Sequence, residues 1–154
     1  MSTFTAETLI ERPANDVWEY AADVPRQPEW MGITSAEVLR GIGTEAGARG
    51  RARMEFGPFR WDVEFDVVEA LRGRRLLWRA DDPHFSEYEV QLDLEPTGAD
   101  STRARYRGSL RLRGIWKALT PLLAMDGATS IRRELERLKA NAEQLAVPSV
   151  APDA

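Results

Sequence analysis

Charged and apolar residues alternate almost without interruption from residue 50 to residue 113, and this alternation constrains the fold more than any other feature of the sequence. A strand with one buried and one solvated face has this period of two, because successive side chains point to opposite sides of a sheet. Turn sequences at 57–58, 72–73, 81–84 and 96–98 divide the stretch. The sequence therefore predicts five consecutive strands.

The solvated faces of these segments carry a second pattern. Taken in order, they are mainly basic, acidic, basic, acidic and basic. Opposite charges on neighbouring strands stabilise a sheet and like charges destabilise it, so the pattern favours an antiparallel meander of sequential neighbours. The arginines at 103–113 could instead form a phosphate-binding ridge. Beside an acidic strand, in a chain of formal net charge −4, we interpret them as a neutralised outer face and expect no nucleic-acid partner.

Shorter elements precede the meander. The pattern predicts a first strand at about 3–11, a helix that begins at Pro13 and is ended by Pro25 and Pro28, and a strand near 33–40. The glycine-rich segment 41–47 joins two predicted strands and has no helix behind it, so we do not interpret it as a phosphate-binding loop.

The last predicted element is a long amphipathic helix. Its apolar residues recur at steps of four, three, four and three: Ile131, Leu135, Leu138, Ala142 and Leu145. Pro121 implies either a helix start near residue 120 or a kink. We expect one domain over 1–146 and a flexible tail over 147–154.

Several kinds of chemistry are excluded or disfavoured by composition. The chain has no cysteine and one histidine, His84, which we interpret as a residue of a solvated turn. A Ser-His-Asp triad and a metal site are therefore not expected, and we expect no cofactor. No apolar run reaches the length of a membrane helix and no signal-peptide pattern is present, so we expect a cytoplasmic protein without stable membrane insertion.

Three stretches of the sequence resemble a known superfamily. They are Ile-Glu-Arg-Pro-Ala-Asn-Asp-Val-Trp at 10–18, the residues Asp23 and Trp30, and Arg-Glu-Leu-Glu-Arg-Leu-Lys at 133–139. Over about 2–145 the chain is similar to the START-like (SRPBCC) superfamily, which includes polyketide cyclase/dehydrase-type proteins, bacterial lipid-transport proteins and Bet v 1-like allergens. The resemblance implies an α+β helix-grip fold. In that fold a seven-stranded curved antiparallel sheet wraps around a long C-terminal helix, with two short helices after the first strand.

The resemblance also implies a cavity between sheet and helix for lipids, polyketides, sterols, quinones or other apolar molecules. The inward parity of the strands independently gathers large apolar and aromatic residues with a few polar tips, which is the usual composition of a small-molecule site. Each aromatic residue could equally be a core residue. The candidate ligand-binding residues are Trp30, Met54, Phe56, Trp61, Trp78, Phe85, Tyr88, Tyr106, Leu110, Leu119 and Leu123.

Three functions stay open. We favour a binding protein for a hydrophobic small molecule, because the carboxylates of the meander have outward parity and no general base is evident. The second is a polyketide cyclase, aromatase or dehydratase, in which Tyr88 and Tyr106 would be the catalytic candidates as hydrogen-bond donors to a developing enolate. The third is an interaction protein whose groove binds a partner chain. We expect a monomer or a homodimer.

Overall fold

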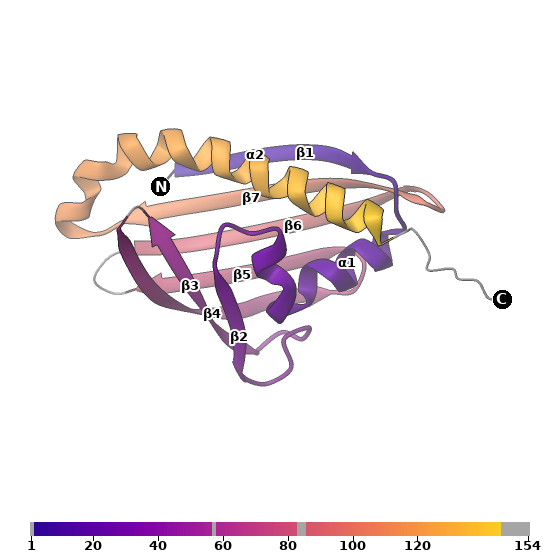
Figure 1. Cartoon of the computed structure of the whole chain (residues 1–154), viewed down its shortest axis with the longest axis horizontal. Coiled ribbons are helices and arrows are strands. Elements are labelled where there is room, and N and C mark those ends of the chain that lie inside the picture. Colours follow the sequence, from indigo (N-terminus) through magenta and orange to yellow (C-terminus); the bar gives the residue numbers. More distant parts are fainter. Residues whose placement is uncertain (1, 57, 83–85, 146–154) are drawn as a thin grey trace.

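The structure, a computed structural model, describes residues 2–56, 58–82 and 86–145, apart from the side chains at 56, 59, 82 and 122–125. Within these residues one antiparallel sheet has the strand order β1-β7-β6-β5-β4-β3-β2, and it curves beneath a long helix (Figure 1). The strands are β1 (Ser2–Ile10), β2 (Ser35–Arg40), β3 (Arg49–Phe56), β4 (Phe59–Leu71), β5 (Arg75–Asp82), β6 (Ser86–Gly98) and β7 (Ser101–Leu112).

Helical elements lie at two places in the chain. Between β1 and β2 come the helix α1 (Ala14–Ala22) and the 3-10 helix η1 (Val24–Glu29), and after β7 come the 3-10 helix η2 (Gly114–Leu119) and the helix α2 (Thr120–Gln144). The predicted helix-grip fold, with two short helices after the first strand, is confirmed. One detail differs, because Pro25 and Pro28 do not simply end the first helix but belong to η1, whose tighter turns tolerate them.

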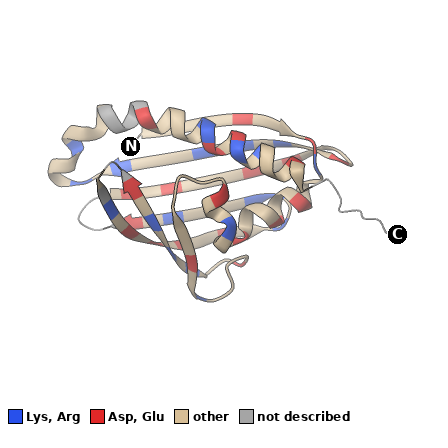
Figure 2. Ribbon diagram, in the orientation of Figure 1, with Lys and Arg blue, Asp and Glu red and all other residues tan. Residues whose placement is uncertain are grey.

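The predicted meander corresponds to β3 through β7, and each strand pairs with its neighbour in sequence. Residues of opposite charge face each other as the charge pattern predicts: Arg53 pairs with Asp62, and Glu95 with Arg103. The Arg53 and Asp62 side chains form an ion pair at 3.0 Å. Figure 2 shows blue and red bands distributed over the whole sheet. The arginine-rich strand β7 thus lies beside acidic partners, which supports a neutralised outer face.

The helix α2 crosses the inner face of the sheet over β1 and β7 (Figure 1). It buries most of the predicted apolar stripe, represented by Ile131, Leu135 and Leu138. Leu145, the last predicted member, follows the end of α2 and is 39% exposed, so the prediction is wrong at this position. Pro121 lies in its first turn, where no backbone N–H is needed, so the first of the two alternatives for this proline is correct. The helix can approach closely because Gly108 of β7 has no side chain: a Cβ there would lie 2.8 Å from Ile131 Cδ1.

Candidate functional site

Three of the predicted site residues form one aromatic cluster on the inner face. The Trp30 ring lies edge-on to Tyr106, with ring centroids 5.6 Å apart and an interplanar angle of 63°. It also lies 6.4 Å from the ring of Trp78. The exposed fractions are 0% for Trp30, 5% for Trp78 and 0% for Tyr106. Trp30 comes from the segment after η1, Trp78 from β5 and Tyr106 from β7, so the fold brings together residues far apart in the sequence.

A carboxyl group from α2 joins this cluster. The Tyr106 hydroxyl donates a hydrogen bond to Glu134 Oε1 at 2.7 Å, and the Gly32 backbone N–H donates one to Glu134 Oε2 at 3.0 Å. The carboxyl therefore connects α2, β7 and the segment after η1. Glu134 is not among the candidate residues predicted from sequence, where no general base was evident.

The surroundings of Glu134 change its acidity. Burial raises the pKa of its carboxyl above the ordinary value, although the hydrogen bonds from Tyr106 and Gly32 and the charge of Arg137 act in the opposite direction. Burial, together with the negative charge of Glu134, also raises the pKa values of the Tyr88 and Tyr106 phenols. Both phenols consequently remain protonated hydrogen-bond donors, and the carboxyl can exchange a proton closer to neutral pH than an exposed glutamate.

Outside the aromatic cluster, parts of the inner face of the sheet are less completely covered. Tyr88 and Leu110, which face each other across β6 and β7, are only half-buried, and so are Met54 and Trp61, which face each other across β3 and β4. The Tyr88 hydroxyl lies close to Gly108, where a Cβ would approach it to 3.0 Å. Tyr88 thus keeps accessible surface, although burial of its phenol is the main cause of its raised pKa.

Of the remaining predicted site residues, only Leu119 has a described side chain. Leu119 lies on η2 and is 39% exposed. Phe85 lies outside the described residues, and the side chains of Phe56 and Leu123 lie outside the described side chains. For these four positions the prediction of ligand contact stays a prediction.

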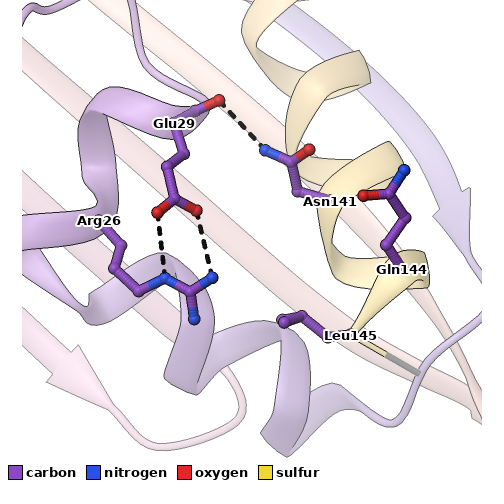
Figure 3. Close-up of a pocket in the computed structure, with 5 residues that line it drawn as sticks. All are labelled: Arg26, Glu29, Asn141, Gln144 and Leu145. Atoms are coloured by element: carbon purple, nitrogen blue, oxygen red, sulfur yellow. Dashed lines mark hydrogen bonds and ion pairs between the residues drawn. The ribbon is translucent and has the colours of Figure 1, made fainter. Parts of the chain in front are cut away.

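A separate polar depression of about 440 Å³ lies between η1 and the C-terminal end of α2 (Figure 3). Arg26 forms an ion pair with Glu29 at 3.2 Å, and Asn141 Nδ2 donates to the Glu29 backbone oxygen at 3.1 Å. The Tyr20 hydroxyl donates to Glu29 Oε1 at 2.9 Å and accepts from Asn141 at 3.0 Å. Burial is the main cause that raises the pKa of Tyr20 to about 12. These contacts hold α1, η1 and α2 together, so we assign them a structural role.

A second depression, of about 480 Å³, lies on the outer face of the sheet and is lined by charged residues of β1, β5, β6 and β7 together with residues near the β4–β5 turn. Neither depression includes a residue of the aromatic cluster. Among the described residues no group of three or more potential metal ligands occurs, and none of the described helices is long and apolar enough to cross a membrane.

The raised pKa of Glu134 predicts a pH dependence of stability. A carboxyl that binds its proton more tightly in the folded state stabilises that state below its ordinary pKa. This contribution is lost as the pH rises from the ordinary value through the raised one. Relative to the variant Glu134→Gln, the free energy of unfolding of the wild type should therefore fall as the pH rises through this window.

Urea denaturation at a series of pH values measures this difference. Other groups contribute to the pH dependence of stability with the opposite sign. One is Glu29, whose pKa is lowered by hydrogen bonds from Arg26 and Tyr20. These contributions are the same in the wild type and in Glu134→Gln, so they cancel in the comparison. Parallel stability curves for the two proteins would contradict the prediction.

The helix-grip architecture, with an interior cluster of aromatic residues and one carboxyl group, is that of the START-like class of proteins. The model of the family "Polyketide cyclase / dehydrase and lipid transport" matches residues 1–143, and the chain belongs to this family. No curated protein sequence matches the chain.

Solved structures share the fold at low sequence identity. A START superfamily protein from Mycobacterium smegmatis superposes with a TM-score of 0.79 at 15% identity, over 94% of this chain and 99% of that one. The Zhui aromatase/cyclase from Streptomyces sp. R1128 superposes with a TM-score of 0.73 at 14% identity, over 97% and 98% of the two chains. At these identities the similarity establishes the fold alone.

Proposed function

We propose that the protein binds a small hydrophobic molecule that carries at least one hydrogen-bonding oxygen, between the sheet and α2. The observation that carries the proposal is the Glu134–Tyr106 pair, 2.7 Å apart, set into a wall of aromatic side chains. Apolar walls with a few directed polar groups are typical of ligand sites, because the walls supply affinity and the polar groups supply orientation. The half-buried residues Tyr88 and Leu110 mark the part of the inner face that the ligand would cover.

Two further polar groups of the cluster support this proposal. The indole nitrogens of Trp30 and Trp78 are buried and have no hydrogen-bond partner among the described residues. A buried indole N–H normally has a partner, and one without a partner costs about 1–3 kcal/mol. Both indoles belong to the cluster that contains Tyr106. A ligand oxygen held at this end of the site would satisfy such a donor.

The names of the matched family and of its structural neighbours agree with this ligand class, since they include lipid transport and an aromatase/cyclase. We further propose that residues 1–146 act as a single cytoplasmic ligand-binding domain, as a monomer or homodimer and without a cofactor. Lipids, polyketides and quinones are the ligand classes that we propose.

Filling the inner face with one side chain should abolish binding. Ala80 faces Tyr88 across β5 and β6 and packs against the core, so the variant Ala80→Phe places a ring where we propose the ligand lies. We expect binding to fall by about tenfold or more, because displaced ligand loses its apolar contacts. Ala140→Phe, on the exposed side of α2, is the matched control and should bind as the wild type does.

Native mass spectrometry and organic extraction of the purified protein would identify a copurifying molecule, and the same molecule then serves for titration of both variants. The outcome that would contradict the proposal is a folded wild-type protein that retains no apolar ligand, or an Ala80→Phe variant that binds it with unchanged affinity.

A second function is favoured by one observation. Glu134 supplies a half-buried carboxyl with a raised pKa beside two phenol donors, and such a set can remove a proton from carbon and stabilise the enolate that results. The protein would then act as a polyketide cyclase, aromatase or dehydratase in the same site, with Glu134 as the acid–base group and Tyr88 and Tyr106 as donors.

A further inference from the structure

Exposed apolar side chains gather where β7 passes into α2. The 3-10 helix η2 contains no buried residue, and within it Ile115 is 85% exposed, Trp116 40% and Leu119 39%. Single exposed apolar residues are ordinary on protein surfaces, whereas a contiguous group marks an interaction site. We call Ile115, Trp116 and Leu119 the η2 surface.

The backbone directs this segment away from the sheet. Gly114 has a φ of +58°, a conformation that residues with a side chain rarely adopt, and it separates the end of β7 from η2. In Figure 1 the segment lies at the left end of the molecule, at the far end of α2 from the depression of Figure 3. It follows directly on β7, whose Leu110 is half-buried and whose last residue, Leu112, is buried.

The chain segment that contains the η2 surface is basic although the whole chain is acidic. Residues 110–125 contain Arg111, Arg113 and Lys117 and no aspartate or glutamate, against a formal net charge of −4 for the chain. Arg113 forms an ion pair with Asp81 at 2.9 Å. Arg111 lies opposite Glu87 of β6 in the sheet. Lys117 of η2 forms no ion pair with another described residue, so its charge is available to an external partner.

We propose that the η2 surface docks on an anionic lipid surface. A short amphipathic segment with large apolar residues, a tryptophan and lysine or arginine binds at the lipid–water boundary: the apolar side chains enter it and the cations attract the headgroups. Tryptophan prefers that boundary because its ring is apolar and its N–H is polar. A second copy of the chain fits less well, because a twofold contact would bring Lys117 towards its symmetry mate.

The proposed contact is peripheral and goes beyond ligand binding, on which it does not depend. The net charge of the whole chain disfavours anionic membranes, whereas the basic segment at η2 favours them.

Cosedimentation with vesicles tests the proposal. The full-length wild type should bind vesicles of phosphatidylcholine mixed with phosphatidylglycerol, bind vesicles of phosphatidylcholine alone more weakly, and dissociate as salt is added. Ile115→Glu should lower binding to the mixed vesicles by about tenfold or more, because it replaces an inserted apolar side chain with an anion. Ile42→Glu is the matched control, since Ile42 is 61% exposed in another loop, and it should bind as the wild type does.

Bromine-labelled lipids give a second measurement, because bromine quenches only tryptophans that reach the lipid. Wild-type fluorescence should be quenched on the mixed vesicles, and Trp116→Phe should lose most of that quenching. The proposal is overturned if the folded wild type does not bind the mixed vesicles, or if Ile115→Glu and Ile42→Glu bind equally. It is also overturned if size-exclusion chromatography shows a wild-type dimer that Ile115→Glu dissociates. Ligand binding is measured separately, by titration without vesicles. A failure of vesicle binding therefore does not contradict ligand binding, and a failure of ligand binding does not contradict vesicle binding.

Discussion

Replacing Trp30 with alanine is expected to lower the free energy of unfolding by about 3–5 kcal/mol, the usual cost of removing a large aromatic side chain from a core. Trp30 is completely buried and contacts both Trp78 and Tyr106, so the truncation leaves a cavity that its rigid neighbours cannot fill. A domain of this size has a total stability of about 5–15 kcal/mol, and the variant is therefore expected to be marginally folded at best.

Urea denaturation followed by circular dichroism measures this loss, with Trp116→Ala as the matched control. Trp116 is 40% exposed on η2 whereas Trp30 is completely buried, so truncation of Trp116 should cost clearly less than truncation of Trp30. Equal losses for the two variants would show that Trp30 does not hold the inner face together. If Trp30→Ala fails to fold, Trp30→Phe can be measured instead. It keeps most of the ring contacts, so its loss of unfolding free energy should lie between those of Trp30→Ala and Trp116→Ala.

The strands could be predicted from sequence because each carries its own periodic signal. In β4 the alternation of Val63, Phe65 and Val67 with charged residues predicts which side is buried, and the acidic residues between them predict an arginine-rich neighbour. Both signals are local and repeat along the strand. A change of register by one residue would reverse them, so they also determine the pairing.

Glu134 could not be predicted in the same way. A glutamate on an amphipathic helix is normally solvated, and Arg132, Arg133 and Glu136 around it are indeed exposed. Its spacing was nevertheless a signal: Ile131, Glu134, Leu138 and Asn141 follow steps of three, four and three, which places all four on one face of α2. Glu134 and Asn141 are the polar members of that face, and both contact other elements.

How completely the inner face beside the aromatic cluster is covered could not be predicted from sequence either. The alternation along a strand predicts on which side of the sheet a side chain lies. It does not predict whether neighbouring residues fill the volume around that side chain. Trp78 and Ala80 have the same parity on β5, yet Trp78 is buried in the cluster whereas Ala80 is only partly covered. This difference depends on the curvature of the sheet and on where α2 crosses it.

Replacing Glu134 with glutamine separates the two candidate functions. The variant keeps the size of the side chain and can still accept the hydrogen bond from Gly32, so a hydrophobic ligand should bind within about tenfold of the wild-type affinity. Cyclisation of a linear poly-β-carbonyl thioester requires proton transfer in addition to binding. A base must take a proton from a carbon between two carbonyls, and the enolate carbon then attacks a distant carbonyl. The new alkoxide takes up a proton and becomes a hydroxyl. Dehydration then removes a second proton from the adjacent carbon, while the hydroxyl takes up a proton and leaves as water, so that a C=C bond forms.

Glutamine can neither take nor return that proton, so the second function predicts that kcat falls by about 100-fold or more while KM changes little. Tyr106→Phe provides an independent test. It removes a hydrogen bond that lowers the pKa of Glu134, so the carboxyl should lose its proton at higher pH and the acidic limb of the rate profile should move in that direction. Turnover that is unchanged in Glu134→Gln would remove this carboxyl from the chemistry. A wild-type protein that binds the thioester without converting it would leave ligand binding as the function of the site.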